Sequence, residues 1–332
     1  MAKLTAEEKK ALTGRGNVIT NDGEHFIARV ITVDGTLTAD EMNVLSEAAK
    51  KFGNGVVAMT SRMTVEVQGI PYENIEAFDA FIGEAGLYTG GTGARVRPIV
   101  PCKGTVCIHG IIDTQALARE LHETFYKGWY DVKLPHKFKI GVGGCPNNCI
   151  KPGLNDFGIM GQRVPEYDMD DCSGCKKCGV IDVCPMKAAF INDDGLMEIN
   201  KDLCNNCGKC VGACHFDCIS EKKVGYKIMV GGIWGKRQRI ATVIDEVYTK
   251  EELFKMVEKA LLLYREQGET GERFGMFIER IGTENFIAQL KSDEVLERKE
   301  AILAADLHTK SKATCLSPTK CKHFARTPLR TA

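Results

Sequence analysis

Cysteines are the residues most able to do chemistry in this chain of 332 residues, which contains 15 of them. Most fall into two groups, one from Cys102 to Cys149 and one from Cys172 to Cys218, and the pair Cys315 and Cys321 lies in a polar tail. A chain of this length can bury a sizeable core and does not need disulfides to fold. Clustered cysteines in such a chain usually bind metal, so we expect metal sites rather than disulfides.

The second group repeats one spacing pattern. Its two runs are Cys172-x2-Cys175-x2-Cys178-x5-Cys184 and Cys204-x2-Cys207-x2-Cys210-x3-Cys214. Two such runs are typical of a bacterial ferredoxin with two [4Fe–4S] clusters, in which the last cysteine of each run binds the other run's cluster. The crossed assignment gives one cluster the ligands Cys172, Cys175, Cys178 and Cys214. It gives the other cluster the ligands Cys204, Cys207, Cys210 and Cys184.

Two features of these runs depart from the usual pattern. Five residues precede Cys184 where three are typical, and His215 stands where proline usually follows the second run. Neither departure removes a ligand. Paired C-x2-C motifs also bind zinc, and this alternative is weakened by eight cysteines in a repeated order. We expect Cys218 to be a small buried residue rather than a ligand.

The first group contains two short pairs, Cys102-x4-Cys107 and Cys145-x3-Cys149, separated by a predicted helix and strand. Four cysteines in this arrangement could hold a third [4Fe–4S] cluster. The two segments around them, Pro101-Cys-Lys-Gly-Thr-Val-Cys107 and Ile140-Gly-Val-Gly-Gly-Cys-Pro-Asn-Asn-Cys149, resemble the sirohaem-dependent sulfite and nitrite reductases. The resemblance extends to 225–232 and 271–275 and covers nearly the whole chain.

This resemblance implies that Cys149 bridges the cluster and the sirohaem iron. The family's first pair is commonly C-x5-C, so the shorter C-x4-C here makes Cys102 the ligand that departs from the pattern. With its inserted ferredoxin, the chain looks like the C component of the anaerobic sulfite reductases, or a small dissimilatory-type relative. The implied reaction is six-electron reduction of sulfite to sulfide, with electrons passed through the two ferredoxin-type clusters.

Four cations match the family's anion-binding residues. They are Arg62, Arg97, Lys137 and Lys139. Alternation along a strand puts the two lysines on one face, which supports a joint role independently of the resemblance. Cations bind a small anion and stabilise the charge that builds as S–O bonds break. The simpler interpretation is that each is an ordinary surface cation.

Sirohaem carries eight carboxylates, and a glycine-rich segment with adjacent cations could bind some of them. We expect contacts from Gly231, Gly232, Lys236, Arg237 and Arg239, with Thr64 and Arg95 as lesser candidates. The alternative is an ordinary basic loop.

The elements that must position these residues follow an α+β pattern. Residues 26–33 predict a strand, and Thr38 with Glu41 forms a capping-box pattern before a helix that stops at Gly53. Strands are predicted over 56–60 and 64–67, and a helix over 73–85. This β-α-β-β-α order predicts a ferredoxin-like half-domain in residues 1–92. The charged residues 1–20 predict a loose arm.

The remainder predicts a sirohaem and [4Fe–4S] α+β domain with the ferredoxin module inserted in it. We expect helices over 113–126, 249–267 and within 272–290, and strands over 137–142 and 226–230. The predicted domain is formed by residues 93–165 and 223–305, the insert by 166–222 and a C-terminal tail by 306–332. We interpret the tail, with Cys315 and Cys321, as a mobile or partner-binding segment, with a metal clip as the alternative.

Composition limits the partners. The chain is 27% charged with a formal net charge of zero, so neither nucleic acid nor a membrane surface is expected to bind. No signal peptide or long apolar stretch is visible, which predicts a cytoplasmic protein. No convincing dinucleotide fingerprint is present, so a flavoprotein or another iron–sulfur subunit should donate electrons, and we expect an oligomer. The alternatives are a nitrite reductase and a polyferredoxin-type carrier without haem.

Overall fold

A computed structural model describes residues 4–309. Its N-terminal part is a four-stranded antiparallel sheet in the order β1-β2-β4-β3, formed by β1 (Asn17–Ile19), β2 (His25–Val30), β4 (Val65–Pro71) and β3 (Val57–Met59). The helices α2 (Ala39–Phe52) and α3 (Ile75–Gly83) share one hydrophobic core with this sheet. The predicted β-α-β-β-α order of the half-domain is confirmed.

Local capping chemistry fixes where helices begin. Glu41 N donates to Thr38 Oγ1 at 3.2 Å, and Thr38 N donates to a carboxylate oxygen of Glu41 at 2.7 Å, so α2 begins at the predicted capping box. The same chemistry corrects one prediction. The described part of the predicted arm, residues 4–20, is not loose, because Thr5 and Glu8 form another capping box and begin the helix α1 (Ala6–Gly14).

The middle part is built on a five-stranded sheet in the order β11-β10-β7-β6-β5. The short strands β5 (Val100–Pro101) and β6 (Ile140–Gly143) are parallel to β7 (Phe157–Tyr167). Beyond β7, the strands β10 (Ile219–Val230) and β11 (Thr242–Tyr248) pair in antiparallel fashion. Strands β7 and β11 were not predicted from the sequence.

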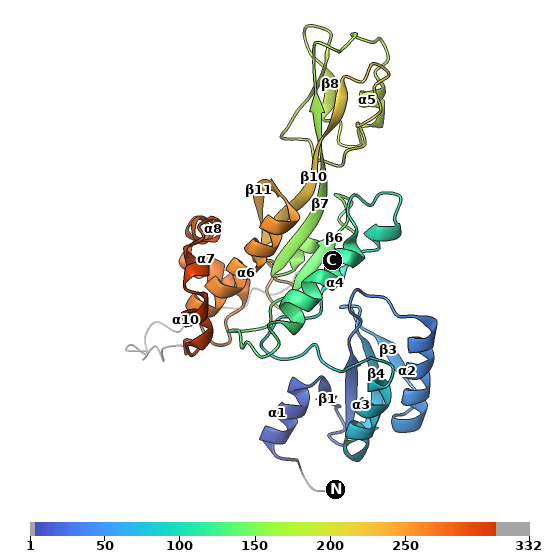
Figure 1. Ribbon diagram of the computed structural model, residues 1–332, viewed down its shortest axis with the longest axis vertical. Helices are drawn as coiled ribbons and strands as arrows, with labels where there is room; N and C mark the ends of the chain where they lie inside the picture. Colours follow the sequence, from blue (N-terminus) through green and yellow to red (C-terminus); the bar gives the residue numbers. More distant parts are fainter. Residues whose placement is uncertain (1–3, 310–332) are drawn as a thin grey trace, which may run out of the picture.

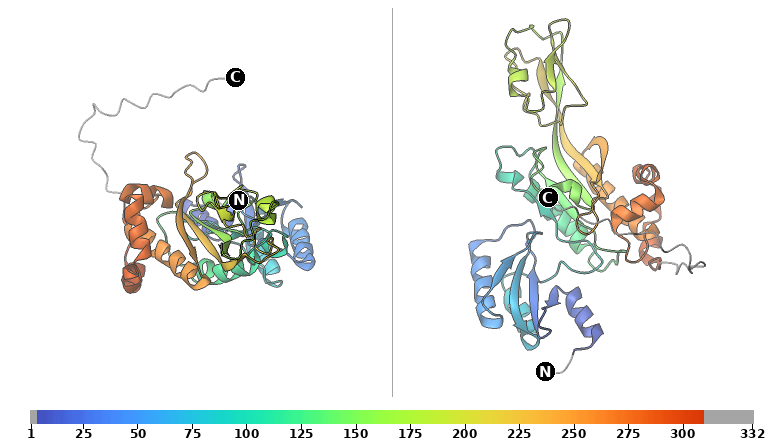
Figure 2. Two further views of the ribbon diagram at one scale, coloured as in Figure 1. Left: turned by 90° about the horizontal axis from the view of Figure 1, so that it is seen from above. Right: turned by 180° about the vertical axis from the view of Figure 1, so that it is seen from behind.

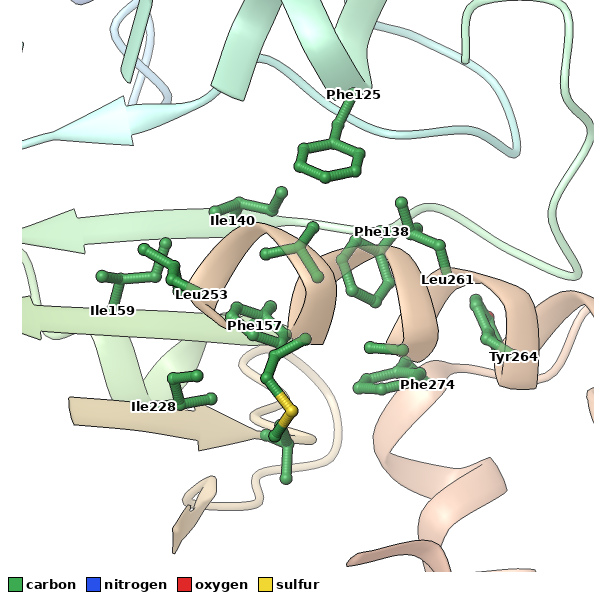
Figure 3. Close-up of a cluster of buried hydrophobic side chains, with 14 of the residues drawn as sticks. Phe125, Phe138, Ile140, Phe157, Ile159, Ile228, Leu253, Leu261, Tyr264 and Phe274 are labelled. Carbon is green, nitrogen blue, oxygen red and sulfur yellow. The ribbon is translucent and has the colours of Figure 1, made fainter. Parts of the chain in front are cut away.

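Helices cover this sheet and close its core. They are α4 (Thr114–Leu121), which continues into a π-helical segment (His122–Lys127), and α6 (Lys250–Gln267), α7 (Phe274–Ile281), α8 (Thr283–Lys291), α9 (Glu294–Glu297) and α10 (Lys299–Ala304). Figure 3 shows Phe138, Phe157 and Phe274 packed beside α6 in this core. Single-turn 3₁₀ helices occupy Tyr72–Asn74, Gly104–Val106 and Pro152–Leu154. Among the described residues, no helix is both long and apolar enough to cross a membrane.

Strands β7 and β10 run beyond the rest of the sheet as a two-stranded ribbon, paired from Phe157 with Val230 to Tyr167 with Ile219. Figures 1 and 2 show the cysteine-rich segment at the far end of this ribbon, opposite the half-domain. That segment contains α5 (Gly179–Val183) and the hairpin of β8 (Ala189–Ile191) and β9 (Met197–Ile199). Its small core consists of buried apolar side chains such as Val180, Met197 and Ile219, with partly buried cysteines packed against them.

Candidate functional site

The sheet brings the two cysteine pairs of the first group together. Strand β5 ends immediately before Cys102, and β6 ends two residues before Cys145. Because β5 and β6 are parallel neighbours, both loops leave the same edge of the sheet. Gly144 N donates to Cys102 Sγ at 3.1 Å across the two loops.

Two glycines allow these loops to approach. A Cβ on Gly144 would lie 2.9 Å from the Cα of Gly104, and a Cβ on Gly104 would lie 2.7 Å from the Thr114 methyl group. Burial raises the pKa of the Cys145 thiol, and the nearby Cys102, Cys149 and Cys107 raise it further. The four thiols are therefore within electrostatic reach of one another.

These four thiols fit a cluster better than one ion. In the part of the chain that the structure describes, no group of three or more Cys, His, Asp or Glu side chains is placed to hold a single metal ion. A [4Fe–4S] cube takes its thiolates at four separate corners, so its ligands need not converge on one point. Cys149 is exposed whereas Cys102, Cys107 and Cys145 are partly buried, so Cys149 has the most open side.

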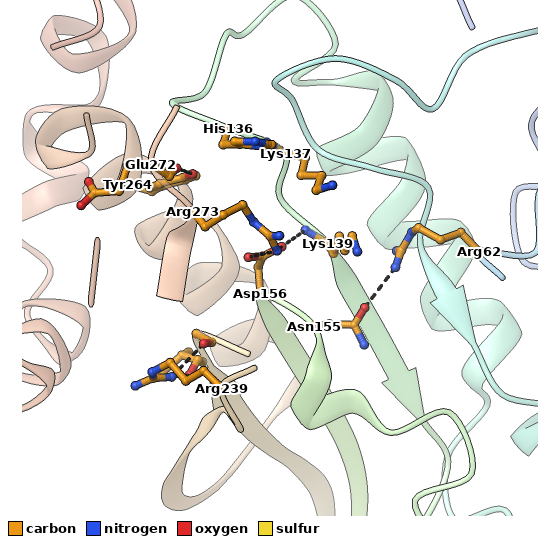
Figure 4. Close-up of polar contacts among 12 residues, drawn as sticks. Arg62, His136, Lys137, Lys139, Asn155, Asp156, Arg239, Tyr264, Glu272 and Arg273 are labelled. Carbon is orange, nitrogen blue, oxygen red and sulfur yellow. Dashed lines mark hydrogen bonds and ion pairs between the residues drawn. The ribbon is translucent and has the colours of Figure 1, made fainter. Parts of the chain in front are cut away.

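A cluster of cations lies at the opposite end of β6, at the boundary with the half-domain. Arg62, in the turn between β3 and β4, donates to Asn155 Oδ1 at 3.1 Å and to the Pro98 and Ile140 carbonyls at 2.7 and 3.3 Å. Figure 4 shows Arg62 directed at Asn155 across this boundary. Burial and neighbouring Arg97 together lower the pKa of Arg62 to about 10, although Asp156 acts in the opposite direction.

Backbone pairing places the other three predicted cations, Arg97, Lys137 and Lys139, next to one another. Arg97 N donates to Phe138 O at 2.8 Å, so Arg97 lies next to Lys137 and Lys139. Phe138 between the lysines is buried, whereas both lysines are partly exposed, which fits the predicted alternation. Burial lowers the pKa of Arg97 to about 10 and that of Lys139 to about 8, and lowers the pKa of Lys137. After burial, neighbouring arginines contribute to all three decreases in pKa. The structure therefore brings Arg62, Arg97, Lys137 and Lys139 together.

Sequence reasoning missed the carboxylate and the fifth cation of this cluster. Asp156 is fully buried and accepts from Arg273 Nη2 at 3.1 Å and from Lys139 N at 3.0 Å (Figure 4). Burial raises the pKa of Asp156, and Arg273 acts in the opposite direction. Burial also lowers the pKa of His136 to about 4, so this imidazole is neutral near pH 7. Arg273 was visible only as part of the 271–275 segment, and no spacing marks Asp156.

Three guanidinium groups in this cluster keep an unused donor. Among the described residues, the Nε atoms of Arg62, Arg97 and Arg273 are buried without a hydrogen-bond partner. Buried donors in native proteins are usually paired. Three unpaired donors on neighbouring cations therefore fit an anionic group or ligand at this place, such as a carboxylate of a tetrapyrrole or an oxyanion.

The residues predicted to contact the sirohaem carboxylates differ in how far their polar groups are already engaged by other residues. Gly232 packs against Gly153 and Asn155. Gly231 lies against Arg239 and Ile278, and its N–H donates to Asp156 O at 2.8 Å. Arg239 is largely occupied, because its Nη1 donates to the Gly231 carbonyl at 2.8 Å and its Nη2 to Thr242 Oγ1 at 3.0 Å. Arg237 pairs with Glu279, and Lys236 is exposed.

The two lesser candidates lie in separate places. Thr64 is buried, and its hydroxyl pairs with Thr60 Oγ1 at 2.7 Å. Arg95 lies over the Tyr130 ring, 4.4 Å from the centroid, beside α1. No sequence pattern indicated that Thr64 pairs with Thr60 or that Arg95 lies over Tyr130.

The second cysteine group divides in space in a way that fits the crossed assignment. One cavity of the segment is lined by Cys184 and by Cys204, Cys207 and Cys210. Burial, with a smaller contribution from the three other thiols of this set, raises the pKa of Cys210 to about 11. Cys218 is buried with its Sγ 3.3 Å from Cys214 Sγ, and burial, followed by Cys214 and Cys172, raises the pKa of Cys218 to about 12. Cys315 and Cys321 lie outside the described residues.

Comparison with known protein families separates the N-terminal half-domain from the middle part of the chain. Residues 92–299 match the nitrite and sulphite reductase 4Fe-4S domain, and residues 18–85 match the nitrite/sulfite reductase ferredoxin-like half domain. The chain belongs to the nitrite and sulphite reductase family. This family of oxidoreductases is the one that the cysteine and glycine segments resembled.

Individual members of the family differ in how much they share with this chain. Coenzyme F420-dependent sulfite reductase of Methanocaldococcus jannaschii is 30% identical over 81% of the chain, which spans 43% of that protein. The C component of the anaerobic sulfite reductase of Salmonella typhimurium is 30% identical over 43% of the chain and 45% of its own length. The crystal structure of dissimilatory sulfite reductase I has a TM-score of 0.65 at 18% identity, covering 81% of this chain and 69% of that one, and so supports the fold.

Proposed function

We propose that this family member is a sirohaem-dependent sulfite reductase, which reduces sulfite to sulfide with six electrons. The observation that carries the proposal is the cation cluster with three unpaired Nε donors beside a [4Fe–4S] domain. The cofactors are sirohaem and three [4Fe–4S] clusters. The ligands of one of these clusters, called the core cluster below, are Cys102, Cys107, Cys145 and Cys149. The clusters of the inserted module take the crossed ligand sets.

The haem–cluster pair, once bound, supplies the electrons and the iron on which the sulfur atom is reduced. The protein's own part is to bind the anion and deliver protons. Arg62, Arg97, Lys137 and Lys139 supply positive charge for sulfite and for the oxygen atoms that leave. Lys139, with a pKa lowered to about 8, can release a proton near neutral pH and regain one from water.

Supporting residues hold these groups in position. Asp156 ties Arg273 and the Lys139 backbone together, and Asn155 orients Arg62. Gly231 and Gly232, with Lys236, Arg237 and Arg239, form the loop proposed for the sirohaem carboxylates, with Thr64 and Arg95 as additional candidates. We further propose a cytoplasmic oligomer that receives electrons from a flavoprotein or an iron–sulfur subunit.

Nitrite reduction is the second candidate, because both activities are named in the matching family. The same cations would bind nitrite as a small anion, and the geometry does not favour one substrate. The three relatives and structures described above are all named as sulfite reductases, and this favours sulfite.

The test begins with protein purified without oxygen from a sirohaem-producing host. About 13 iron atoms per chain, from three clusters and one haem, together with sirohaem absorption bands, support the proposal. About 8 iron atoms without haem bands would instead identify a polyferredoxin-type carrier. Turnover of sulfite and nitrite with a viologen donor then separates the substrates, and faster use of nitrite at equal concentration overturns the sulfite assignment.

A matched pair of lysine variants tests the anion site. Lys137→Met removes a cation of the cluster, whereas Lys133→Met removes an exposed lysine four residues earlier in the same segment. The first is expected to raise KM for sulfite strongly at unchanged iron and haem content. Equal KM values in the two variants would remove Lys137 from the site.

A further inference from the structure

A cleft of about 280 Å³ lies where the cysteine-rich module meets the middle domain. One wall carries Cys145, a proposed ligand of the core cluster, and the other carries Cys207, a proposed ligand of a module cluster. Among the cysteines that the structure describes, only these two line the cleft. The cation cluster plays no part in it.

The second cysteine run is fastened to the ribbon at this cleft. Arg163 of β7 donates its N–H to Asn206 O at 2.8 Å and forms a parallel bridge with Cys207. Gly208 lies so close that a Cβ there would be 2.4 Å from Arg163 Cδ. Gly208 also has φ of +67°, which favours glycine. The run from Cys204 to Cys210 is therefore held in one orientation against β7.

The first run lies elsewhere in the module. None of Cys172, Cys175, Cys178 and Cys214 lines the cleft, and Cys172 Sγ accepts from Met197 N on β9 instead. The two crossed ligand sets thus have unequal positions. One set places Cys207 in the cleft with Cys145, whereas no cysteine of the other set lines it.

We propose that the cluster of Cys184, Cys204, Cys207 and Cys210 is the one that passes electrons to the core cluster, across the cleft between Cys207 and Cys145. The cluster of Cys172, Cys175, Cys178 and Cys214 receives them from the external one-electron donor. Each transfer oxidises one cluster and reduces the next by one electron, with no bond or proton moved. This order rests on the proposed function, because it requires a core cluster as acceptor.

Charges at the cleft give the order a specific signature. Arg163 Nε pairs with Glu221 on β10, and both residues line the cleft, so both act on the cluster that faces it. A nearby positive charge stabilises the reduced, more negative cluster, and a nearby negative charge destabilises it. Arg163 is accordingly a positioning residue that also raises the reduction potential of the transferring cluster.

Electron paramagnetic resonance of the partly reduced holoenzyme tests the order without any substitution. The two module signals are assigned first with Cys175→Ser and Cys204→Ser, and titanium(III) is the reductant, since it adds no sulfur oxyanion. The signal of the second-run cluster should relax faster, because it lies nearer the paramagnetic haem iron. Faster relaxation of the first-run signal overturns the inference.

Charge variants give an independent readout. Arg163→Gln should lower the midpoint potential of the second-run cluster by ~59 mV, which is a tenfold change for one electron, and Glu221→Gln should raise it. Lys222→Gln is the control, since Lys222 pairs with Glu166 outside the cleft. Shifts confined to the first-run cluster, or equal shifts in all three variants, refute the assignment. If the purified protein contains neither sirohaem nor the iron of the core cluster, the proposed function is refuted, and this is known before either of these two experiments is made.

Discussion

Replacing Lys139 with methionine should stabilise the substrate-free protein while removing activity. The pKa of Lys139 falls from 10.5 to about 8, first because of burial and then because of Arg62 and Lys137. At about 1.4 kcal/mol per pH unit, keeping this amine charged at pH 7 costs about 3 kcal/mol. The half-buried amine still reaches solvent, so we expect Lys139→Met to gain about 1–3 kcal/mol.

The gain has a defined pH dependence. Unfolded chains bind a proton at Lys139 more tightly than the folded protein does, so the wild-type stability rises as pH increases from about 8 to 10.5. The variant lacks this titration. Its advantage should therefore be full below pH 8 and should shrink steadily above it.

Thermal unfolding of both proteins between pH 7 and 10, with and without sulfite, measures this effect. Sulfite should stabilise the wild type more than the variant, because the bound anion offsets the repulsion among the cations. Lys133→Met serves as the control and should show no comparable gain. An unchanged difference between pH 7 and 10, or a variant less stable than the wild type at pH 7, would refute the reasoning.

Three further changes follow from the same geometry. Arg62→Leu leaves Asn155 and two carbonyls without their donor and should lower stability by about 3 kcal/mol in thermal unfolding. The control Arg15→Leu breaks exposed ion pairs with Glu76 and Asp79 and should lower stability by less than about 1 kcal/mol. Asp156→Asn leaves the charge of Arg273 uncompensated and should lower the free energy of unfolding by about 3–5 kcal/mol. It should also lower the rate of sulfite reduction at unchanged iron content, and an unaltered rate would contradict this. Gly144→Ala forces a Cβ to within 2.9 Å of Gly104 and should remove about four iron atoms per chain in an iron assay. Gly83→Ala, at an exposed position of α3 with nothing within 4 Å of its Cβ, should keep them.

Local chemistry explains what could be predicted from the sequence. Thr38 and Thr249 satisfy the first N–H groups of their helices with nearby side chains, so α2 and α6 begin where the capping boxes indicated. Strand β7 was missed because glycines and Pro165 interrupt its alternation, and its pairing with β10 supplies the stability that its own sequence does not. Asp156 and Arg273 are 117 residues apart, and no spacing rule connects them. The predicted ligand sets and anion-binding roles remain predictions until the cofactors are measured.

The ribbon of β7 and β10 has an evolutionary consequence. Asp168 N donates to Cys218 O at 2.9 Å, so the segment between them leaves and rejoins the chain at one point. The strands are already paired on the near side of that point, and a short turn could join them equally well. The segment between Asp168 and Cys218 can thus be gained, lost or exchanged without altering the register of the five-stranded sheet.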